Sequence, residues 1–222
     1  MNLSIVEMFP TLQGEGSMAG SPSVFLRLSG CNMWSGYEKT REKGAGDCSL
    51  WCDTWFAKGD KLDPENICDN ILALTGSWAH PMVVVTGGEP LLQLRRKGAG
   101  RTLELLREHG VYLALETNGT INDSVVELFD HVTVSPKLLK SDPNTLDHVK
   151  LRKGTDLKVV MPQWGMDQLR EMDKWDFEFK YVQPCDPGEG GGMYEATMKA
   201  INTAQEMGWK VSVQTHKLIG LP

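Results

Sequence analysis

Short apolar runs rich in β-branched residues alternate with segments of helical periodicity along most of the 222-residue chain. The apolar runs predict strands over residues 5–9, 24–28, 82–86, 111–116, 131–135, 157–161, 179–183 and 210–214. The helical segments predict helices over residues 64–74, 100–108, 122–129, 166–172 and 193–207. Strands that alternate with helices are typical of parallel β/α units. The sequence contains no evident repeat or linker, so we predict a single α/β domain over residues 1–222.

Polar and glycine-rich segments follow several of the predicted strands. They are Thr86-Gly87-Gly88-Glu89, Glu116-Thr117-Asn118-Gly119, Ser135-Pro136-Lys137, Gln183-Pro184-Cys185-Asp186 and Gln214-Thr215-His216-Lys217. In parallel sheets and barrels, active sites lie at the carboxyl ends of the strands. The repeated placement of these segments therefore predicts one site at that end of the sheet. Glycine has no Cβ, so the pair at 87 and 88 also allows a small molecule to approach the backbone closely.

Composition narrows the class of protein. Hydrophobic residues make up 41% of the chain and charged residues 23%, as in ordinary globular proteins. The net charge of −6 disfavours nucleic-acid binding, which normally needs a basic face. The apolar runs are too short to span a bilayer and no signal peptide is evident, so we expect no membrane partner and a cytoplasmic location. An odd number of cysteines, five, favours reduced thiols over a disulfide framework.

Three of the cysteines, Cys31, Cys48 and Cys52, lie in one segment between two predicted strands. Thiolates are the usual ligands of iron–sulfur clusters, and three of them would leave one iron of a four-iron cluster without a protein ligand. Catalytic metals use open positions of this kind. The amino and carboxylate groups of S-adenosylmethionine could fill it, and an electron from the cluster would then cleave that cofactor. Two alternatives stay open, namely unrelated structural cysteines or a zinc site completed by a histidine such as His80.

Several longer motifs carry a resemblance to a known family. They are Phe9-Pro10-Thr11-Leu12-Gln13-Gly14-Glu15-Gly16, Phe25-Leu26-Arg27-Leu28-Ser29-Gly30-Cys31-Asn32, Cys52-Asp53-Thr54, Thr86-Gly87-Gly88-Glu89-Pro90, Glu116-Thr117-Asn118-Gly119, Val134-Ser135-Pro136-Lys137, Leu157-Lys158-Val159-Val160, Gln183-Pro184 and Gln214-Thr215-His216-Lys217. With these motifs the chain resembles the 7-carboxy-7-deazaguanine synthases, radical S-adenosylmethionine enzymes of queuosine (7-deazapurine) biosynthesis. The Gly-Gly-Glu-Pro element is general to that superfamily, whereas the first and last motifs are more specific to the synthases.

The cysteine segment departs from the usual pattern of the superfamily, in which three residues separate the first two cysteines and two separate the last two. Some synthases carry a long insertion after the first cysteine that begins like Trp34-Ser35-Gly36, and we identify residues 32–47 as such an insertion. The last interval differs, because three residues lie between Cys48 and Cys52. One extra residue can bulge out of a loop without separating the two sulfurs, so we still expect both cysteines to bind the cluster.

The resemblance implies an incomplete parallel β/α barrel with a C-terminal tail that closes the site. It implies the rearrangement of 6-carboxy-5,6,7,8-tetrahydropterin to 7-carboxy-7-deazaguanine with loss of ammonia. The implied cofactors are a [4Fe-4S] cluster, S-adenosylmethionine and Mg²⁺. The implied partners are a one-electron donor such as flavodoxin and a second copy of the chain in a homodimer. Two other functions stay open: an activase that places a glycyl radical on a partner protein, and a non-catalytic zinc-binding protein.

The resemblance also assigns the site residues. Cys31, Cys48 and Cys52 bind the cluster, and Thr54 binds Mg²⁺. The pterin contacts are Leu12, Gln13, Gly14, Arg27, Thr86, His216 and Pro222, and the S-adenosylmethionine contacts are Gly88, Ser135, Pro136, Lys137, Gln183, Pro184, Cys185 and Asp186. Glu116 is the candidate catalytic residue, facing the substrate or the cofactor ribose. Taken by itself, Arg27 lies in an apolar strand, where it either points to solvent or points inward and needs an anionic partner such as a carboxylate.

Overall fold

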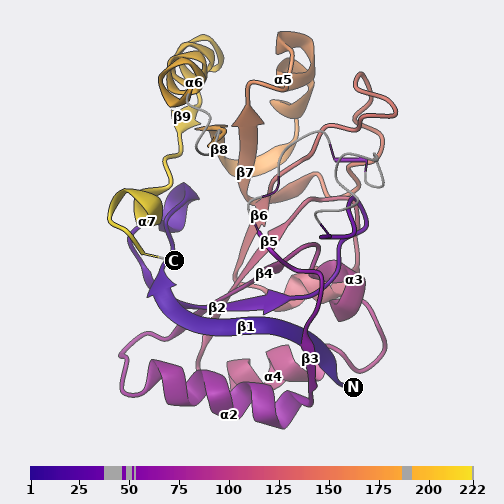
Figure 1. Cartoon of the computed structure of the whole chain (residues 1–222), viewed down its shortest axis with the longest axis vertical. Coiled ribbons are helices and arrows are strands. Elements are labelled where there is room, and N and C mark those ends of the chain that lie inside the picture. Colours follow the sequence, from indigo (N-terminus) through magenta and orange to yellow (C-terminus); the bar gives the residue numbers. More distant parts are fainter. Residues whose placement is uncertain (38–46, 49–51, 53, 187–191, 222) are drawn as a thin grey trace.

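The computed structural model describes residues 1–37, 47–48, 52, 54–186 and 192–221 (Figure 1). Within this part of the chain, one sheet runs in the order β3-β1-β2-β4-β5-β6-β7-β8-β9. Its strands are β1 (Leu3–Leu12), β2 (Pro22–Leu28), β3 (Asp60–Leu62), β4 (Met82–Gly87), β5 (Tyr112–Thr117), β6 (His131–Val134), β7 (Lys153–Met161), β8 (Asp176–Pro184) and β9 (Lys210–Val211). The helices are α2 (Pro64–Thr75), α3 (Leu91–Leu94), α4 (Arg101–Glu108), α5 (Met166–Met172), α6 (Met193–Met207) and α7 (Thr215–Leu218), with the 3₁₀ turns η1 (Gly16–Met18) and η2 (Ser124–Leu128). This architecture confirms the predicted α/β class.

The sheet is parallel from β2 to β9 and antiparallel at its N-terminal edge. Each pair of neighbours from β2 onwards is parallel, whereas β1 is antiparallel to both β2 and β3. Within the described chain, β3 and β9 are the two edges and do not pair with each other, so the sheet forms an open barrel. This arrangement confirms the expected incomplete barrel. A strand was predicted at the position of β1, but its antiparallel direction was not, because alternation of strands and helices indicates parallel pairs only. The short strand β3 was not predicted.

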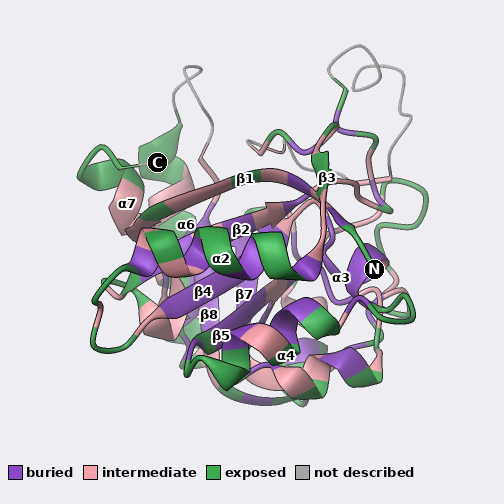
Figure 2. Cartoon of the chain, turned by 90° about the horizontal axis from the view of Figure 1, so that it is seen from below, coloured by how far each residue is buried: buried purple, intermediate pink, exposed green. Residues whose placement is uncertain are grey.

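The main core lies between the sheet and its helices. Figure 2 shows α2 and α4 with exposed outer faces, packed over strands that are largely buried. Helix α2 starts at Pro64 because the Asp63 carboxylate caps it, accepting a hydrogen bond from the Asn66 amide at 2.8 Å. On the helix side of the sheet, strand residues such as Val83 and Leu113 are fully buried. Removing these apolar side chains from water stabilises the sheet that carries the site.

The opposite, inner face of the sheet changes from apolar to polar along the strands. Met82, Val84 and Ala114 form a small buried cluster at the amino ends of β4 and β5. Two residues beyond Val84 and Ala114, the same face carries Thr86 and Glu116, because side chains alternate between faces along a strand. The fold thereby places polar side chains inside the barrel at the carboxyl ends of its strands, next to a small apolar floor.

Several elements differ from the predicted ones in length or type. The sequence predicts a helix over 122–129, where the structure has only the short turn η2. The strand predicted over 210–214 ends at Val211, because the chain then turns toward the loop after β1, where the Thr215 amide donates to the Gly14 carbonyl at 3.0 Å. Helices α3 and α7 were not predicted, since four residues are too few to show a period. None of the helices in the described ranges is both long and apolar enough to cross a membrane.

Candidate active site

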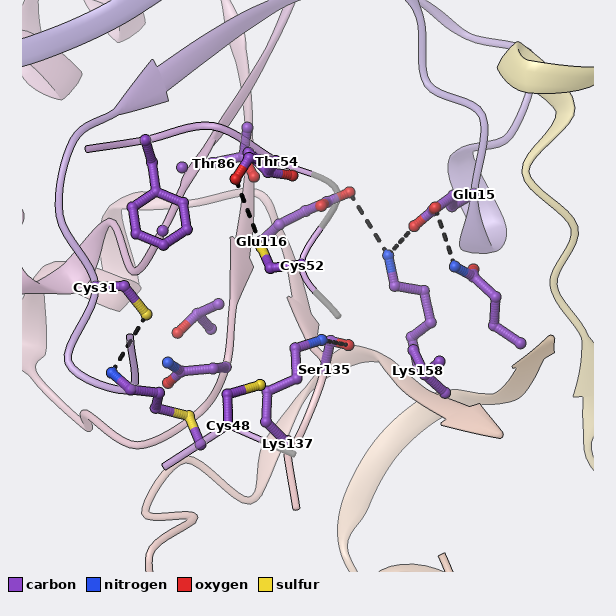
Figure 3. Close-up of a pocket in the computed structure, with 18 of the residues that line it drawn as sticks. Glu15, Cys31, Cys48, Cys52, Thr54, Thr86, Glu116, Ser135, Lys137 and Lys158 are labelled. Carbon is purple, nitrogen blue, oxygen red and sulfur yellow. Dashed lines mark hydrogen bonds and ion pairs between the residues drawn. The ribbon is translucent and has the colours of Figure 1, made fainter. Parts of the chain in front are cut away.

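A pocket lies at the carboxyl ends of the parallel strands and collects most of the predicted site residues (Figure 3). From the predicted set, its lining contains Cys31, Cys48, Cys52, Thr54, Thr86, Gly88, Glu116, Ser135, Lys137, Gln183, Pro184, Cys185 and Asp186. These residues come from the ends of β4, β5, β6 and β8 and from the segment after β2. The pocket therefore lies where parallel sheets and barrels hold their active sites.

The glycine pair after β4 brings that strand end against the cysteine segment. A Cβ on Gly88 would lie 2.4 Å from the carbonyl oxygen of Gly30 and 2.7 Å from the Cβ of Cys31, which is closer than atoms can approach. The Glu89 amide then donates to the Gly30 carbonyl at 2.9 Å. Any side chain at position 88 would displace Cys31, so this glycine is required for packing as well as for ligand access.

Glu89 ties the ends of β4 and β5 together. Its side chain is fully buried and accepts hydrogen bonds from the Leu91 amide at 3.0 Å and from the Thr117 hydroxyl and the Asn118 amide at 2.8 Å. Burial raises the pKa of Glu89, and these hydrogen bonds and Lys137 oppose that shift. No sequence motif assigned Glu89 a contact, although a carboxylate between glycines and an apolar helix start is an unusual placement.

The three cysteines stand around one hollow of the pocket (Figure 3). Burial raises the pKa of the Cys31 thiol despite a hydrogen bond from the Met33 amide at 3.4 Å, and the Cys52 thiol donates to the Thr54 carbonyl at 3.7 Å. Among the described residues, no three His, Cys, Asp or Glu side chains lie close enough to share one metal ion, and His80 does not line the pocket. A four-iron cluster has a separate iron for each thiolate, so ligands spread around a hollow suit it better than a single zinc ion.

A buried group of charges, which we call the lysine cluster (Glu15, Glu116 and Lys158), lines another side of the pocket. The Lys158 ammonium contacts the Glu15 carboxylate and lies 3.9 Å from Oε1 of Glu116. Gln183 and Gln214 donate to Oε1 of Glu15 at 3.0 and 2.8 Å.

The lysine cluster is ionised despite its burial. Burial opposes the charge on Glu15, but Lys158 and these hydrogen bonds outweigh that effect and lower the pKa of Glu15 to about 2. Burial opposes the charge on Lys158 too, but Glu116 and Glu15 raise its pKa. Glu15 and Lys158 are therefore both charged at neutral pH.

Glu15, Lys158 and Gln214 line the pocket although no motif assigned them a role. The available signal was Lys158, which lies between the apolar residues Leu157 and Val159 in the second half of β7. A buried lysine without a partner would be costly, so its position predicts a carboxylate nearby. The identity of that carboxylate could not be predicted, because Glu15 lies 143 residues away along the chain.

The C-terminal segment packs on the loop that follows β1. The Thr215 amide and hydroxyl both donate to the Gly14 carbonyl at 3.0 Å. A Cβ on Gly14 would lie 1.9 Å from Nδ1 of His216, so only glycine lets the two segments meet. The Lys217 ammonium then pairs with Asp186 at 2.8 Å, at the end of β8. The structure thus brings Gly14 and His216, two predicted pterin contacts, into direct proximity; neither lines the pocket, whereas the nearby Glu15 and Gln214 do.

Three further residues were predicted to contact the pterin or S-adenosylmethionine, namely Gln13, Leu12 and Pro136. Gln13 is buried and donates to Oε1 of Glu116 at 2.9 Å, which fixes the candidate catalytic carboxylate. Leu12 is the last residue of β1, and Pro136 is buried two residues after the end of β6; neither lines the pocket. Pro222 lies outside the described residues.

Arg27 lies on the inner face of the sheet but does not line the pocket. It is the register partner of Thr86 in the parallel pair of β2 and β4, so both side chains share one face. Its Nε donates to Oε1 of Glu7 at 2.6 Å, and its guanidinium lies 5.9 Å from the ring centroid of Phe9. Of the two alternatives for this arginine, the structure shows the inward one, with Glu7 as the anionic partner.

The chain is similar to known proteins over its whole length. No protein-family model matches it. The chain is 38% identical to the 7-carboxy-7-deazaguanine synthase of Burkholderia multivorans and 36% identical to that of Nitratidesulfovibrio vulgaris, over 100% of both proteins in each case. The crystal structure of QueE from Escherichia coli is similar with a TM-score of 0.69 at 26% identity, covering 96% of this chain and 94% of that one. The chain therefore belongs to the 7-carboxy-7-deazaguanine synthase family.

Proposed function

We propose that this chain converts 6-carboxy-5,6,7,8-tetrahydropterin to 7-carboxy-7-deazaguanine with loss of ammonia, using a [4Fe-4S] cluster, S-adenosylmethionine and Mg²⁺. The observation that carries the proposal is one pocket lined both by three cysteines and by the lysine cluster, in a chain of this family. The first set suits a redox cofactor, and the second suits a substrate rich in N–H groups and oxygens.

The cysteine side of the pocket has the chemistry that the cofactors need. Cys31, Cys48 and Cys52 would each bind one iron and leave the fourth iron to S-adenosylmethionine. When bound, the reduced cluster and S-adenosylmethionine supply a radical that can remove a hydrogen atom from the substrate. Gly88 lines the pocket and packs its backbone directly against the Gly30 carbonyl and Cys31. We assign Gly88, Ser135, Pro136, Lys137, Gln183, Pro184, Cys185 and Asp186 to S-adenosylmethionine.

The lysine cluster would orient the pterin. Carboxylates accept hydrogen bonds from ring N–H groups, and Lys158 keeps Glu15 ionised for that purpose. The hydrogen bond from Gln13 fixes the Glu116 carboxylate, which can therefore orient the substrate so that its reacting carbon stays in one place. Such orientation is the main contribution that a protein makes to a radical reaction. Arg27 would exchange its present carboxylate partner for the substrate carboxylate, which a guanidinium binds through two hydrogen bonds. We assign Leu12, Gln13, Gly14, Thr86, His216 and Pro222 to the pterin as well.

Thr54 is the proposed Mg²⁺ ligand. Its side chain lines the pocket between the cysteine side and Thr86 (Figure 3). A hydroxyl oxygen suits a hard cation that takes its other ligands from water and substrate oxygens. Mg²⁺ at this position would fix the substrate carboxylate.

The reaction also needs partners. Reductive cleavage of S-adenosylmethionine requires one electron from outside, so we propose an external donor such as flavodoxin, and a homodimer as the assembly. An odd number of cysteines, five, of which three are proposed as thiolate ligands, suits a reducing compartment such as the cytoplasm.

Anaerobic reconstitution with iron and sulfide tests the proposal. The loaded chain is incubated with dithionite, S-adenosylmethionine and the pterin, and we expect 7-carboxy-7-deazaguanine and ammonia in equal amounts. Cys31→Ala should abolish iron loading and product, whereas Cys68→Ala, which changes a cysteine buried in α2, should retain both. Stoichiometric zinc without iron would refute the cofactor assignment. Cleavage of S-adenosylmethionine without the deazaguanine product would refute the substrate assignment.

A further inference from the structure

Cys48 is held by the connection between β6 and β7, residues 135–152. It forms an isolated antiparallel bridge with Leu139. The preceding residue, Asp47, accepts hydrogen bonds through its carboxylate from the Ser141 amide, at 2.7 Å, and from the Ser141 hydroxyl. The Asp47 carbonyl accepts a further hydrogen bond from the Lys140 amide at 2.8 Å. We call the contacts of Asp47 with Lys140 and Ser141 the Asp47 clamp.

The spacing of the cysteines explains why a clamp of this kind is needed. Three residues separate Cys48 from Cys52 and sixteen separate it from Cys31, so neither neighbour along the chain determines its position. Fixing the backbone of a residue costs conformational entropy, and a thiolate must occupy a defined place to bind one iron of a cluster. Contacts with a second segment can supply that order. The Met33 carbonyl adds one more, accepting from the Cys48 amide at 3.3 Å.

The segment on the other side of the clamp also lines the pocket. It contains Ser135 and Lys137, whose ammonium donates to the Ser135 hydroxyl at 2.8 Å. The Lys137 carbonyl accepts a hydrogen bond from Nε2 of His148 at 2.8 Å, which braces the segment from within the same connection. The clamp therefore joins a cysteine on one side of the pocket to the residues on the neighbouring side.

We propose that Asp47 is a positioning residue, which holds Cys48 in place through Ser141 and couples it to the side of the pocket that carries Ser135 and Lys137. The inference rests on the proposed function, because it takes Cys48 as a cluster ligand. Asp47 itself does not line the pocket. Its carboxylate restricts the backbone next to the ligand by accepting hydrogen bonds from the Ser141 amide and hydroxyl.

Three variants test the clamp. Asp47→Ala removes the acceptor, and Asp47→Asn keeps one acceptor oxygen. Asp147→Ala is the matched control, because that carboxylate belongs to the same connection and is 95% exposed. Hydrogen exchange at the Ser141 amide is measured without cluster. Iron loss to a chelator, and the electron paramagnetic resonance spectrum of the reduced cluster with and without S-adenosylmethionine, are measured after reconstitution.

Asp47→Ala removes both hydrogen bonds from Ser141, so we expect the exchange rate at Ser141 and the rate of iron loss each to rise by at least about fivefold, the net effect of one ordinary hydrogen bond. The spectral change on adding S-adenosylmethionine should also differ from that of the wild type. Asp47→Asn should lie close to the wild type, and Asp147→Ala should match it.

Two results would overturn the proposal. One is iron loss from Asp47→Ala at the rate of the wild type and of Asp147→Ala, and the other is faster iron loss with amide exchange at Ser141 unchanged, because the clamp would then not be its cause. A wild-type chain that takes up no iron would refute the proposed function instead. Exchange at Ser141 would still report on the clamp in that case, so the two failures are distinguishable.

Discussion

Replacing Lys158 by methionine should strongly destabilise the fold, because it leaves the Glu15 carboxylate buried without its cation. The Lys158 side chain is 6% exposed and that of Glu15 is 12% exposed. Methionine keeps much of the length of lysine and removes its charge. Breaking a buried ion pair by removing one partner costs about 3–5 kcal/mol. In a domain of this size, 1 kcal/mol lowers the Tm by about 2–4 °C, so we expect a fall of about 10 °C.

The dependence on pH makes this prediction specific to the pair. In the wild type the pKa of Glu15 falls from its usual 4.5 to about 2 in the folded state. The resulting stabilisation is fully present above pH 4.5 and is lost as the pH falls toward 2. At about 1.36 kcal/mol for each pKa unit, it amounts to about 3 kcal/mol. Without Lys158, burial acts against the carboxylate and raises its pKa, so the variant should become more stable as the pH falls below neutral.

Urea denaturation of the cluster-free protein, at about pH 7 and about pH 5, measures both effects. Lys199→Met is the matched control, because Lys199 is exposed on α6. Glu15→Gln combined with Lys158→Met should recover most of the loss, since the uncompensated charge is gone. A Lys158→Met variant within about 1 kcal/mol of the wild type at neutral pH, or with the same slope against pH, would refute the reasoning.

Three further substitutions test the packing around the pocket. Gly88→Ala should reduce iron loading severalfold by displacing Cys31, as measured by iron content after reconstitution, while the far-ultraviolet circular dichroism stays unchanged. Glu89→Ala should cost about 3 kcal/mol or more in urea denaturation, because it strands three buried donors. Gly14→Ala should release the C-terminal segment from the loop after β1, which would appear as faster amide exchange at Thr215 and a raised KM for the pterin.

The sheet was largely predictable because its signals are local. Runs such as Val83 to Val85 are β-branched and bounded by polar segments, and the strand ends then mark the site without any knowledge of the three-dimensional arrangement. Because Glu116 follows one of these strands and the cysteines follow another, their positions at strand ends also predicted a common region for them. The direction of β1 could not be predicted in this way, because strand polarity depends on how a connection crosses the sheet rather than on the strand's own residues.

The lysine cluster shows the other limit of sequence reasoning. The position of Lys158 predicts a carboxylate partner, but the sequence contains several acidic residues. Only the fold shows that the partner is Glu15. Gly88 shows a related limit. Its glycine pattern predicted close approach of a ligand, and the structure adds that the backbone of the cysteine segment itself occupies that space. Both features are contacts between segments far apart in the chain, and a single sequence does not specify which distant segment supplies the partner.

The loop after β1 explains how an open barrel can still enclose a site. Among the described residues the two edge strands of the sheet, β3 and β9, do not pair with each other, and the gap lies on the side where α7 and η1 stand next to each other (Figure 1). The Ser17 amide and hydroxyl donate to the buried Asp156 carboxylate of β7 at 2.8 Å, while the Gly14 carbonyl holds Thr215. Gly16 has a φ of +65°, and a Cβ there would lie 2.4 Å from Asp156. Two glycines thus let one short loop contact both β7 and the C-terminal segment, which closes the barrel without a further strand and carries Glu15 into the pocket between them.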